Sequence, residues 1–521
     1  MAQDTILFDT MSPDSSDYEK GLKSVTNLLP ADANGWREVR ALAFKANLAL
    51  PASSSLVGSF SDPNGTIYVG STRTAGPSSR LLSYVDSPAA FTNRTPGVDF
   101  AGAPSWWTFA KFGDSVIAAP WNVGTGAAIQ LQVRTGAAAT FANLVTSADR
   151  PAPKFLAVSR SHVIGAHNLA NGGAGLYAAA NPYRFMWCAR NNAAVWTPGT
   201  DRAGFAQVDD DLGEITGAIG FKDYALIFQQ FGVTRLSWIG GDAVWQQDEL
   251  AAHDFGLGGN ASFRWPSIVR AQRAAYYVSN RGPAVTNGES AQFLGEGVVR
   301  RELVDPQSSN GWSFTKPITS AYSSDGYVAW LGEFRILAGG KICTVYHVPT
   351  GRWSLINDFE ALGASSPPEV LGVVKTGTPA YSFDGMRLFN FNAAVNEINA
   401  WGFTSATATM TATLATKRWR PSPGTRASIT GVRPIFLLDL LGGAYPTVTI
   451  FVTGYNEART AVFTETLTTA DADANGVIQG APLPLSATEF RFSLSIPTLG
   501  AAPTIRELTG LEIFYDEVSI F

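Results

Sequence analysis

The sequence predicts an all-β protein: a β-propeller of six or seven blades, some of them irregular, followed by an antiparallel β-sandwich domain. Three observations support this prediction. The 521 residues include 51 Gly and 29 Pro with a 12% aromatic share, which is typical of many short strands joined by turns. Units of strand, turn and strand recur at a spacing of roughly 40 to 55 residues, the size of a four-stranded propeller blade. After Trp401 the pattern changes to longer alternating strands.

Residues 1–54 precede the recurring units, and we interpret them as an N-terminal arm. The segment is polar at first, then contains Leu28-Leu29-Pro30 and the turn Ala33-Asn34-Gly35. Helical periodicity is scarce throughout the chain, and the best helical candidate is the short segment from Asp17 to Leu29.

Residues 55–400 contain the repeated units of strand, turn and strand that predict the propeller. One unit runs through Trp106–Ala110, a Gly-Asp turn and Val116–Ala119, and similar units follow along the chain. A single four-stranded sheet cannot bury both of its faces, whereas sheets stacked radially bury them and leave only short edges exposed. We expect the segment from Leu56 to Val85 to close the ring against the last blade.

Residues 405–521 form the expected β-sandwich. Their alternating strands are clearest in Thr447–Thr453, Glu489–Leu494 and Leu511–Tyr515, around a turn-rich stretch from Asp471 to Gly480. Alternation of apolar and polar residues indicates antiparallel strands with one buried face.

Composition and charge narrow the classes of function. Apolar residues make up 45% of the chain and charged residues 16%, which excludes a disordered or coiled-coil protein. The net charge is −5 and no run of Lys or Arg is present. Because affinity for phosphates requires cations, the sequence does not favour tight binding of DNA.

The cysteine content and the N-terminal residues indicate the cellular compartment in which the chain is expected to fold. Cys188 and Cys343 are the two cysteines, too few for a disulfide framework, and we expect buried thiols in a chain made in a reducing cytoplasm. The first residues have neither the basic nor the apolar region of a signal peptide. The apolar stretch Pro434–Leu441 is too short to span a bilayer, so we expect no membrane insertion by this chain.

No motif for catalysis, a metal or a cofactor stands out. His162 and His167 are interpreted as ordinary loop residues rather than metal ligands, because the spacing of known zinc motifs is missing. The acidic run Asp209–Glu214 lacks the calcium-loop pattern and predicts a solvated turn. Ser323–Gly326 and Ser382–Gly385 resemble sialidase Asp-boxes incompletely, and Asp-Gly is favoured in hairpin turns. We therefore expect no enzyme and no cofactor.

Tryptophans are abundant in the predicted propeller, and several stand at strand ends. They are interpreted as packing between blades rather than as platforms for sugars. The residues concerned are Trp187, Trp196, Trp238, Trp245, Trp265, Trp312, Trp330 and Trp353.

Several segments in order along the chain resemble one family of phage proteins. The proteins of that family have a strand pair, a glycine-rich loop and a hairpin with a shared pattern of residue types. In this chain the strand pair corresponds to Ile215, Gly217, Tyr224, Ile227, Phe228, Gln229, Val233 and Arg235, and the hairpin and the segment after it correspond to Tyr276–Gly282 and Leu294–Val298. Two further segments agree: Cys343–Ser354, with its Arg352-Trp353-Ser354, and the entry strand Ser24–Pro30. The chain resembles the tail-nozzle and packaged-DNA stabilisation proteins of short-tailed bacteriophages, the tail tubular protein B-like family. The resemblance covers the propeller and the entry strand but not the C-terminal domain.

The resemblance implies architecture rather than chemistry. It implies a structural virion protein in a homo-oligomeric ring, a hexamer in the family, below the portal and adaptor. Such a nozzle retains packaged DNA and conducts it during ejection. The implied partners are the adaptor or head-tail connector proteins, tail fibre or spike proteins, and the genomic duplex in transient, non-specific contact. A glycan-binding or glycosidase propeller, or another tail or baseplate subunit, is the alternative.

If the chain forms such a ring, we expect DNA to be retained sterically, by loops that narrow the bore. Glycine-rich loops need few contacts to move and are the candidates. The candidate bore loops contain Gly172, Gly173, Gly175, Gly256, Gly258 and Gly259.

Overall fold

The computed structural model describes most of the chain, in segments separated by gaps. The described residues are 2–8, 11–13, 21–31, 35–97, 99–101, 103–121, 130–145, 149–170, 175–241, 244–251, 254–258, 264–304, 311–314, 316–323, 325–333, 341–357, 359, 368–373, 385–403, 410–421, 425–438, 448–469, 477–479, 487–496 and 505–518. Strands dominate this part of the chain. Its helices are the short α2 (Arg300–Val304) and the 3-10 turns η1 (Asp210–Leu212) and η2 (Trp265–Ser267). None of its helices is long and apolar enough to cross a membrane.

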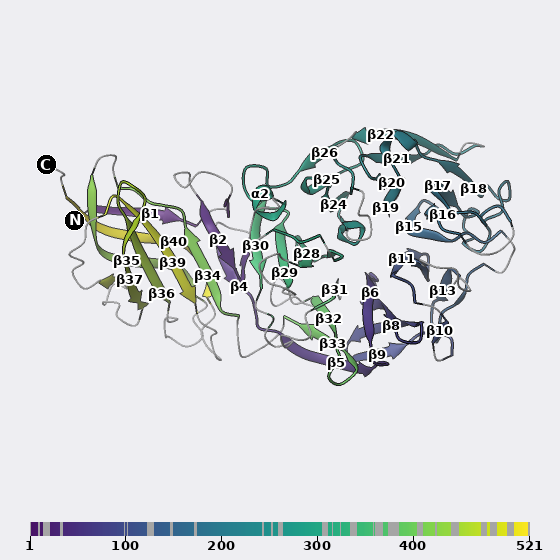
Figure 1. The fold of residues 1–521 in the computed structure, drawn as a ribbon, viewed down its shortest axis with the longest axis horizontal. Helices are drawn as coiled ribbons and strands as arrows, with labels where there is room; N and C mark the ends of the chain where they lie inside the picture. Colours follow the sequence, from purple (N-terminus) through teal and green to yellow (C-terminus); the bar gives the residue numbers. More distant parts are fainter. Residues whose placement is uncertain are drawn as a thin grey trace.

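Seven sheets of the described residues form a β-propeller, arranged around a common axis as Figure 1 shows. Each blade begins with its innermost strand. The first three blades contain β6 (Ser54–Ser61), β7 (Ile67–Arg73), β8 (Ser78–Asp86), β9 (Ala89–Asn93) and β10 (Phe100–Ala101); β11 (Trp106–Phe112), β12 (Ser115–Trp121), β13 (Gln132–Thr135) and β14 (Ala142–Asn143); and β15 (Pro153–Ser159), β16 (His162–Asn168), β17 (Asn181–Trp187) and β18 (Gly204–Gln207).

The other four blades continue around the ring in chain order. They contain β19 (Ile215–Gly220), β20 (Tyr224–Gln229), β21 (Val233–Trp238) and β22 (Trp245–Ala251); β23 (Val269–Ala271), β24 (Ala274–Ser279), β25 (Gly282–Thr286) and β26 (Ala291–Phe293); β27 (Thr319–Tyr322), β28 (Tyr327–Glu333), β29 (Lys341–His347) and β30 (Arg352–Ile356); and β31 (Val370–Val373), β32 (Met386–Asn392) and β33 (Glu397–Gly402) with β5 (Ala43–Ala49).

The ring closes through β5, the outer strand of blade 7. It pairs with β33 from Ala49 opposite Glu397 to Ala43 opposite Gly402. The sequence predicts closure by Leu56–Val85, and this segment forms the inner strands of blade 1, which pack against blade 7, but the strand that completes blade 7 is β5, which the sequence does not predict. The difference arises because the strand pairs with a partner some 350 residues away, and no local pattern reports such a pairing.

Arg387 and Asp86 join blades 7 and 1 at this closing seam. The Arg387 Nε and Nη2 atoms donate to the two Asp86 carboxylate oxygens at 3.0 and 2.8 Å. Arg387 is 1% exposed, and Tyr84 donates a further hydrogen bond to Asp86. Burial by itself raises the pKa of Asp86, but the Arg387 contacts outweigh it and hold the pKa below its usual value.

Two further groups of paired strands lie beside the propeller (Figure 1): the continuation of the blade 6 sheet beyond β30, and one separate sheet. One contains β2 (Leu22–Thr26), β34 (Ala412–Thr416), β39 (Glu489–Ile496), β36 (Thr449–Tyr455) and β37 (Ala461–Thr468). The other contains β3 (Leu28–Pro30), β4 (Trp36–Glu38), β40 (Ile505–Val518), β35 (Arg426–Leu438) and β38 (Ile478–Gln479), with β1 (Ala2–Leu7) also paired to β40. Apolar residues of both sheets belong to one buried cluster, which includes Phe490, Phe492, Leu511 and Ile513. We call this part the C-terminal module.

The N-terminal residues are integrated in both parts of the molecule. The sequence predicts an arm for residues 1–54, whereas the structure places β1 to β4 in the sheets of the C-terminal module and β5 in the propeller. Within the helical candidate Asp17–Leu29, the described residues from Leu22 onward are mainly strand. These strands pair with segments hundreds of residues away, so tertiary hydrogen bonding overrides a weak local preference.

Candidate functional site

Two of the segments compared above with the phage family, Ser24–Pro30 and Cys343–Ser354, lie at the junction between the propeller and the C-terminal module. Strand β2 pairs in parallel with β30 of blade 6 at Thr26 and Leu355 and antiparallel with β34 on its other side. One nine-stranded sheet therefore runs from blade 6 into the C-terminal module. A continuous hydrogen-bonded sheet couples the two parts mechanically.

Asn27 is the residue around which this junction is built. Its amide Nδ2 donates to the Thr411 carbonyl at 2.7 Å, and its Oδ1 accepts from the Asn357 N–H at 3.1 Å. Its backbone N–H donates to Leu355, and its backbone carbonyl accepts from Val39. The side chain thus joins the exit of blade 6 to the entry of β34. The backbone has φ 58°, a left-handed conformation that asparagine tolerates better than most residues.

The segment Arg352-Trp353-Ser354 packs on the other side of the same junction. Arg352 donates from Nη1 to the Gly35 carbonyl at 3.3 Å, and its guanidinium lies 5.7 Å from the Trp36 ring centre. The Ser354 hydroxyl donates to the carbonyl of Leu28. These contacts give a physical reason for the residue types in both segments that carry the resemblance.

Four aromatic rings, from blades 2 and 3 and from η2, pack together near the axis of the propeller. Trp265 contacts Trp106 and Phe155, with ring centres 6.0 and 5.3 Å apart, and Phe155 contacts Trp121 at 6.1 Å. Trp106 pairs with Trp121 across the first two strands of blade 2. Trp265 comes from η2, just before blade 5, whereas Trp106 belongs to blade 2. Because blades 2 and 5 are not neighbours, this contact crosses the axis, and we call the four residues the axial quartet.

The position of the axial quartet agrees with the packing expected for the tryptophans. Trp265 packs against three separate buried clusters, which together draw on blades 1 to 5 and 7. Trp196, Trp312, Trp330 and Trp353 are at most 1% exposed. Burial on this scale makes most of these rings core residues rather than open platforms.

The strands that flank the predicted glycine loops have their connected ends on one face of the propeller. One loop connects β16 to β17 and the other connects β22 to β23, and the alternating strand directions place these strand ends on the same face. Gly172, Gly173 and Gly259 lie outside the described residues. Gly175 is exposed, with φ 112°.

Gly256 and Gly258 are tightly held, in contrast to the prediction of few contacts. The N–H of Gly258 donates to Gln230, and the Gly256 carbonyl accepts from the N–H of Asn280. A Cβ on Gly256 would lie 2.4 Å from the Gln230 carbonyl oxygen. These glycines are therefore required by close approach of the backbone between blades 4 and 5.

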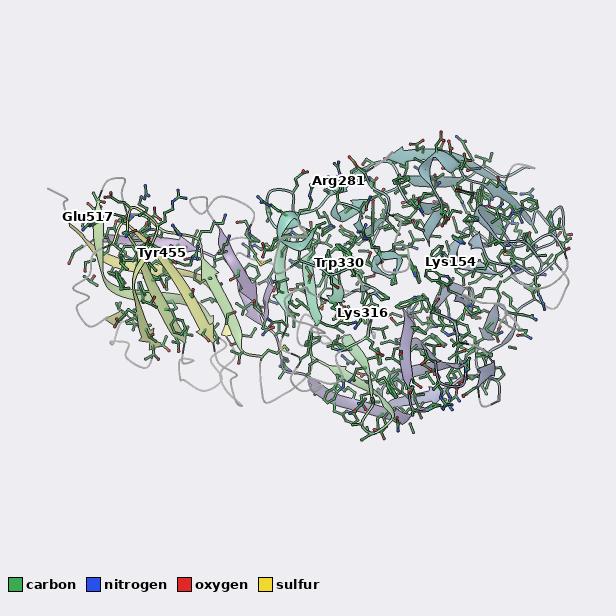
Figure 2. All side chains as sticks on the ribbon, viewed as in Figure 1. Lys154, Arg281, Lys316, Trp330, Tyr455 and Glu517 are labelled. Carbon is green, nitrogen blue, oxygen red and sulfur yellow. The ribbon has the colours of Figure 1, made fainter. Side chains whose placement is uncertain are left out.

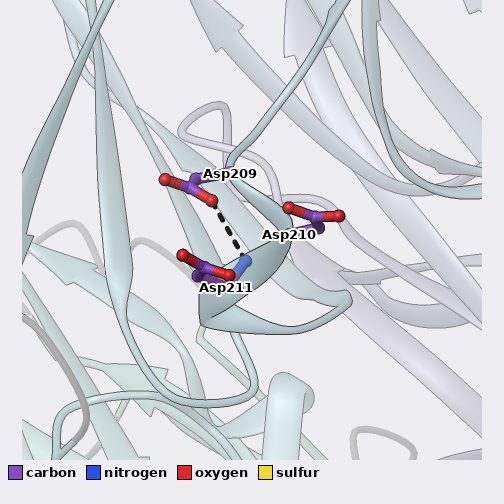
Figure 3. A group of neighbouring side chains, drawn as sticks. All are labelled: Asp209, Asp210 and Asp211. Atoms are coloured by element: carbon purple, nitrogen blue, oxygen red, sulfur yellow. Dashed lines mark hydrogen bonds between the residues drawn. The ribbon is translucent and has the colours of Figure 1, made fainter.

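The acidic run folds as a turn. Figure 3 shows Asp209, Asp210 and Asp211 around η1, with the Asp209 carboxylate accepting from the backbone N–H of Asp211 at 3.0 Å. All three side chains are exposed, and their ligand atoms lie within 4.8 Å of one another. Asp209 caps the 3-10 turn, as the interpretation of a solvated turn requires.

The histidines differ from the sequence interpretation. His162 and His167 are predicted as loop residues, but both are buried and lie in β16, near its two ends. Their Nδ1 atoms hydrogen-bond the carbonyls of Cys188 and Ile215. The sequence pattern indicates only part of β16, because alternation is weak where both faces of a strand are buried.

Two smaller predictions are confirmed. Cys188 and Cys343 are buried free thiols. Asp325 and Gly326 lie in the hairpin turn between β27 and β28, where Gly326 has φ 90°. The second Asp-Gly pair includes Asp384, which lies outside the described residues.

The sequence carried no signal for the junction beyond the resemblance, and none for the axial quartet. Both depend on pairs of residues far apart in the chain. The positive φ of Asn27 and the contact across the axis depend on the tertiary structure, and the residue types alone do not predict them.

Comparison with known proteins adds little. No family model matches the chain, and no curated protein matches it. Among solved structures, the chain is similar to the WD40 domain of Neurospora crassa Pan2, with 10% identity and a TM-score of 0.41. The match covers 71% of this chain and 97% of that chain.

Proposed function

We propose that the chain is a structural, non-enzymatic subunit of a bacteriophage tail, of the tail-nozzle kind. One observation carries this proposal: the two segments Ser24–Pro30 and Cys343–Ser354, each similar to the phage family, contact each other at the junction, where the Ser354 hydroxyl donates to the Leu28 carbonyl. They are separated by more than 300 residues, and Ser354, one of the residues that carries the resemblance, makes the contact. In this proposal the junction is the framework that holds the C-terminal module, which we infer to be an antiparallel β-sandwich, at a set position beside the propeller.

The assembly proposed is a homomeric ring, six-fold by the resemblance, located in the virion below the adaptor or head-tail connector proteins. Tail fibres or spikes are further partners. A heterologous contact that closes on itself generates such a ring. A propeller and a module joined by one continuous sheet suit this role, because a rigid subunit keeps the rotation between neighbours constant.

The DNA path in this proposal runs between subunits and not through any one propeller. The axial quartet occupies the axis of the propeller, and Trp106 and Trp121 are only 5% and 6% exposed. A duplex cannot pass such an axis without unfolding the blades. A ring of several copies then provides the bore, and its loops retain DNA sterically.

A reconstruction of the phage particle is the deciding experiment. We expect this chain in a ring below the portal and adaptor, with the propeller and the C-terminal module both contacting neighbouring copies. Native mass spectrometry of the purified protein and of disassembled tails measures the copy number. A monomer in solution together with no ring in the particle contradicts the proposal.

DNA binding by the isolated protein tests the steric mechanism. With a net charge of −5, we expect weak binding of a duplex, because each phosphate contact adds a salt-dependent increment of affinity. Sub-micromolar binding that falls steeply with salt refutes steric retention. Saturable binding on a glycan array, or turnover of chromogenic glycosides, favours the alternative of a glycan-binding or glycosidase propeller.

A further inference from the structure

One face of blades 3 to 5 carries an excess of exposed cations. The innermost strands β15, β19 and β23 end on this face, and we call it the exit face. Six exposed basic residues lie in or next to its connections and are named the cationic rim: Arg160, Arg190, Arg202, Lys222, Arg270 and Arg273. In the described part of these connections the exposed carboxylates are Asp201, Asp223 and Glu289. Cations therefore predominate here, although the chain as a whole has a net charge of −5.

Contacts between neighbouring connections join the cationic rim across the blades. The Arg160 guanidinium of blade 3 pairs with Asp223 of blade 4 at 2.7 Å, and the Arg160 N–H donates to the Lys222 carbonyl at 3.0 Å. Arg270 of blade 5 donates from Nη1 to the Gly220 carbonyl of blade 4 at 3.3 Å. The basic side chains of the three blades therefore belong to one surface.

The opposite face of the same blades carries the acidic run. The strands β15, β19 and β23 begin on this entry face, and residues 208–214, which connect β18 to β19, lie on it. This segment contains no cation, and its four exposed carboxylates form what we call the acidic turn: Asp209, Asp210, Asp211 and Glu214. Arg281, labelled in Figure 2, is on the same face but pairs with Asp254 at 2.9 Å, so its charge is already balanced.

Each charged group borders an exposed apolar side chain of blade 4. Phe231 is 43% exposed on the entry face, and its N–H donates to the carbonyl of Leu212, within the acidic turn, at 3.0 Å. Ile239 is 53% exposed on the exit face and follows Trp238, whose ring centre lies 5.2 Å from the Arg160 guanidinium. Exposed apolar side chains with charged residues at their border are typical of surfaces that bind other proteins.

The two charged groups are too far apart to neutralise each other within one molecule. Strands of six residues, such as β19 and β20, separate the two faces by about 20 Å. Salt screens exposed charges beyond about 8 Å at physiological ionic strength. Each face therefore presents its own charge to a partner, and a second copy of this chain offers the counterpart of both faces.

We propose that copies of this chain associate head to tail, with the cationic rim and Ile239 of one copy against the acidic turn and Phe231 of the next. This inference rests on the homomeric ring proposed above and specifies one of its contacts. The two surfaces differ, so the interface is heterologous, as a ring of more than two copies requires. Their complementary charges fix the orientation and accelerate the association. The carboxylates Asp201, Asp223 and Glu289 within the exit face, together with Ile239, favour a protein partner over the phosphates of a nucleic acid.

Sedimentation velocity of the full chain at micromolar concentration tests this contact. We expect oligomers in about 0.05 M salt, and a dissociation constant that is about tenfold or more higher in about 0.5 M salt. Two double variants each disable one surface: Lys222→Glu with Arg273→Glu, and Asp210→Lys with Asp211→Lys, which leaves the Asp209 cap in place. Each variant by itself should be monomeric. Their equimolar mixture should form dimers and nothing larger, because one intact rim can meet one intact acidic turn.

The matched controls Arg426→Glu and Glu457→Lys reverse exposed charges on the C-terminal module and should associate as the wild-type protein does. Melting temperatures show that each variant folds. A wild-type protein that stays monomeric in low salt, or folded double variants that associate like wild type, overturns the head-to-tail contact, and so does a mixture that forms no dimer. In each case the ring itself is still decided by the reconstruction of the particle. If the rim variant loses only the binding of a DNA duplex and not self-association, the rim is a nucleic-acid surface and the proposal is wrong.

Discussion

Replacement of Asn27 by alanine tests whether the junction holds the molecule together. Asn27 is 3% exposed and makes two side-chain hydrogen bonds, to Thr411 and Asn357. Loss of two buried hydrogen bonds costs about 2 to 3 kcal/mol in total. Alanine at φ 58° adds about 1 kcal/mol of backbone strain. The expected loss of stability for Asn27→Ala is therefore about 3 to 4 kcal/mol.

The chain offers a matched control for the backbone contribution. Asn191 also has φ 58°, but its side chain is exposed, so Asn191→Ala should cost about 1 kcal/mol through strain alone. Asn27→Gly removes the hydrogen bonds without the strain and should fall between the two alanine variants.

Urea unfolding followed by tryptophan fluorescence measures these differences. Trp36 and Trp353 are buried near the junction and report on it directly. The midpoint should fall in the order wild type, Asn191→Ala, Asn27→Gly, Asn27→Ala. If Asn27→Ala unfolds at the same urea concentration as Asn191→Ala, then the hydrogen bonds of Asn27 do not stabilise the junction and the reasoning fails.

Three other changes probe the propeller. Arg387→Met breaks the bidentate ion pair with Asp86 at the closing seam and should lower the free energy of unfolding by about 3 kcal/mol, measured by urea denaturation. A decrease of less than about 1 kcal/mol would contradict a stabilising role for this pair. Burial raises the pKa of Glu369 to about 7, so its contribution to stability is complete below about pH 4 and is lost as the pH rises through 7. Between pH 5 and 8 the melting temperature of Glu369→Gln should therefore change less than that of the wild-type protein. If both proteins show the same change of melting temperature with pH, this explanation is ruled out. Gly256→Ala should destabilise strongly, because its Cβ meets backbone at 2.4 Å. Gly297 has open space around it but φ 68°, so Gly297→Ala should cost only about 1 kcal/mol of backbone strain; equal melting temperatures for the two variants refute the steric argument.

Local patterns in the sequence were sufficient to predict the strands of the propeller. The hairpin of β11 and β12 and the turn at Gly326 follow from apolar runs interrupted by residues that favour turns. The buried state of Cys343 also follows from its apolar neighbours. These features depend on residues close together in the chain, where residue type and spacing carry the information.

The candidate sites were less accessible to prediction from the sequence. The glycines at 256 and 258 were chosen as flexible, but the structure shows that they are needed where two backbones approach closely. The contact between Trp265 and Trp106 was not predicted either, because a contact between distant segments leaves no pattern in the sequence.

The sequence by itself determined that this protein is built from short strands in blade-sized units and that a different β-rich region follows them. Only the tertiary structure decided how the chain closes and joins its parts: β5 completes blade 7, β2 links blade 6 to the C-terminal module, and Trp265 crosses the axis. The physical reason is that hydrogen bonding within a hairpin depends on neighbouring residues, which leave a pattern in the sequence. Pairing between distant segments depends on which edges and faces remain exposed after the local units have folded.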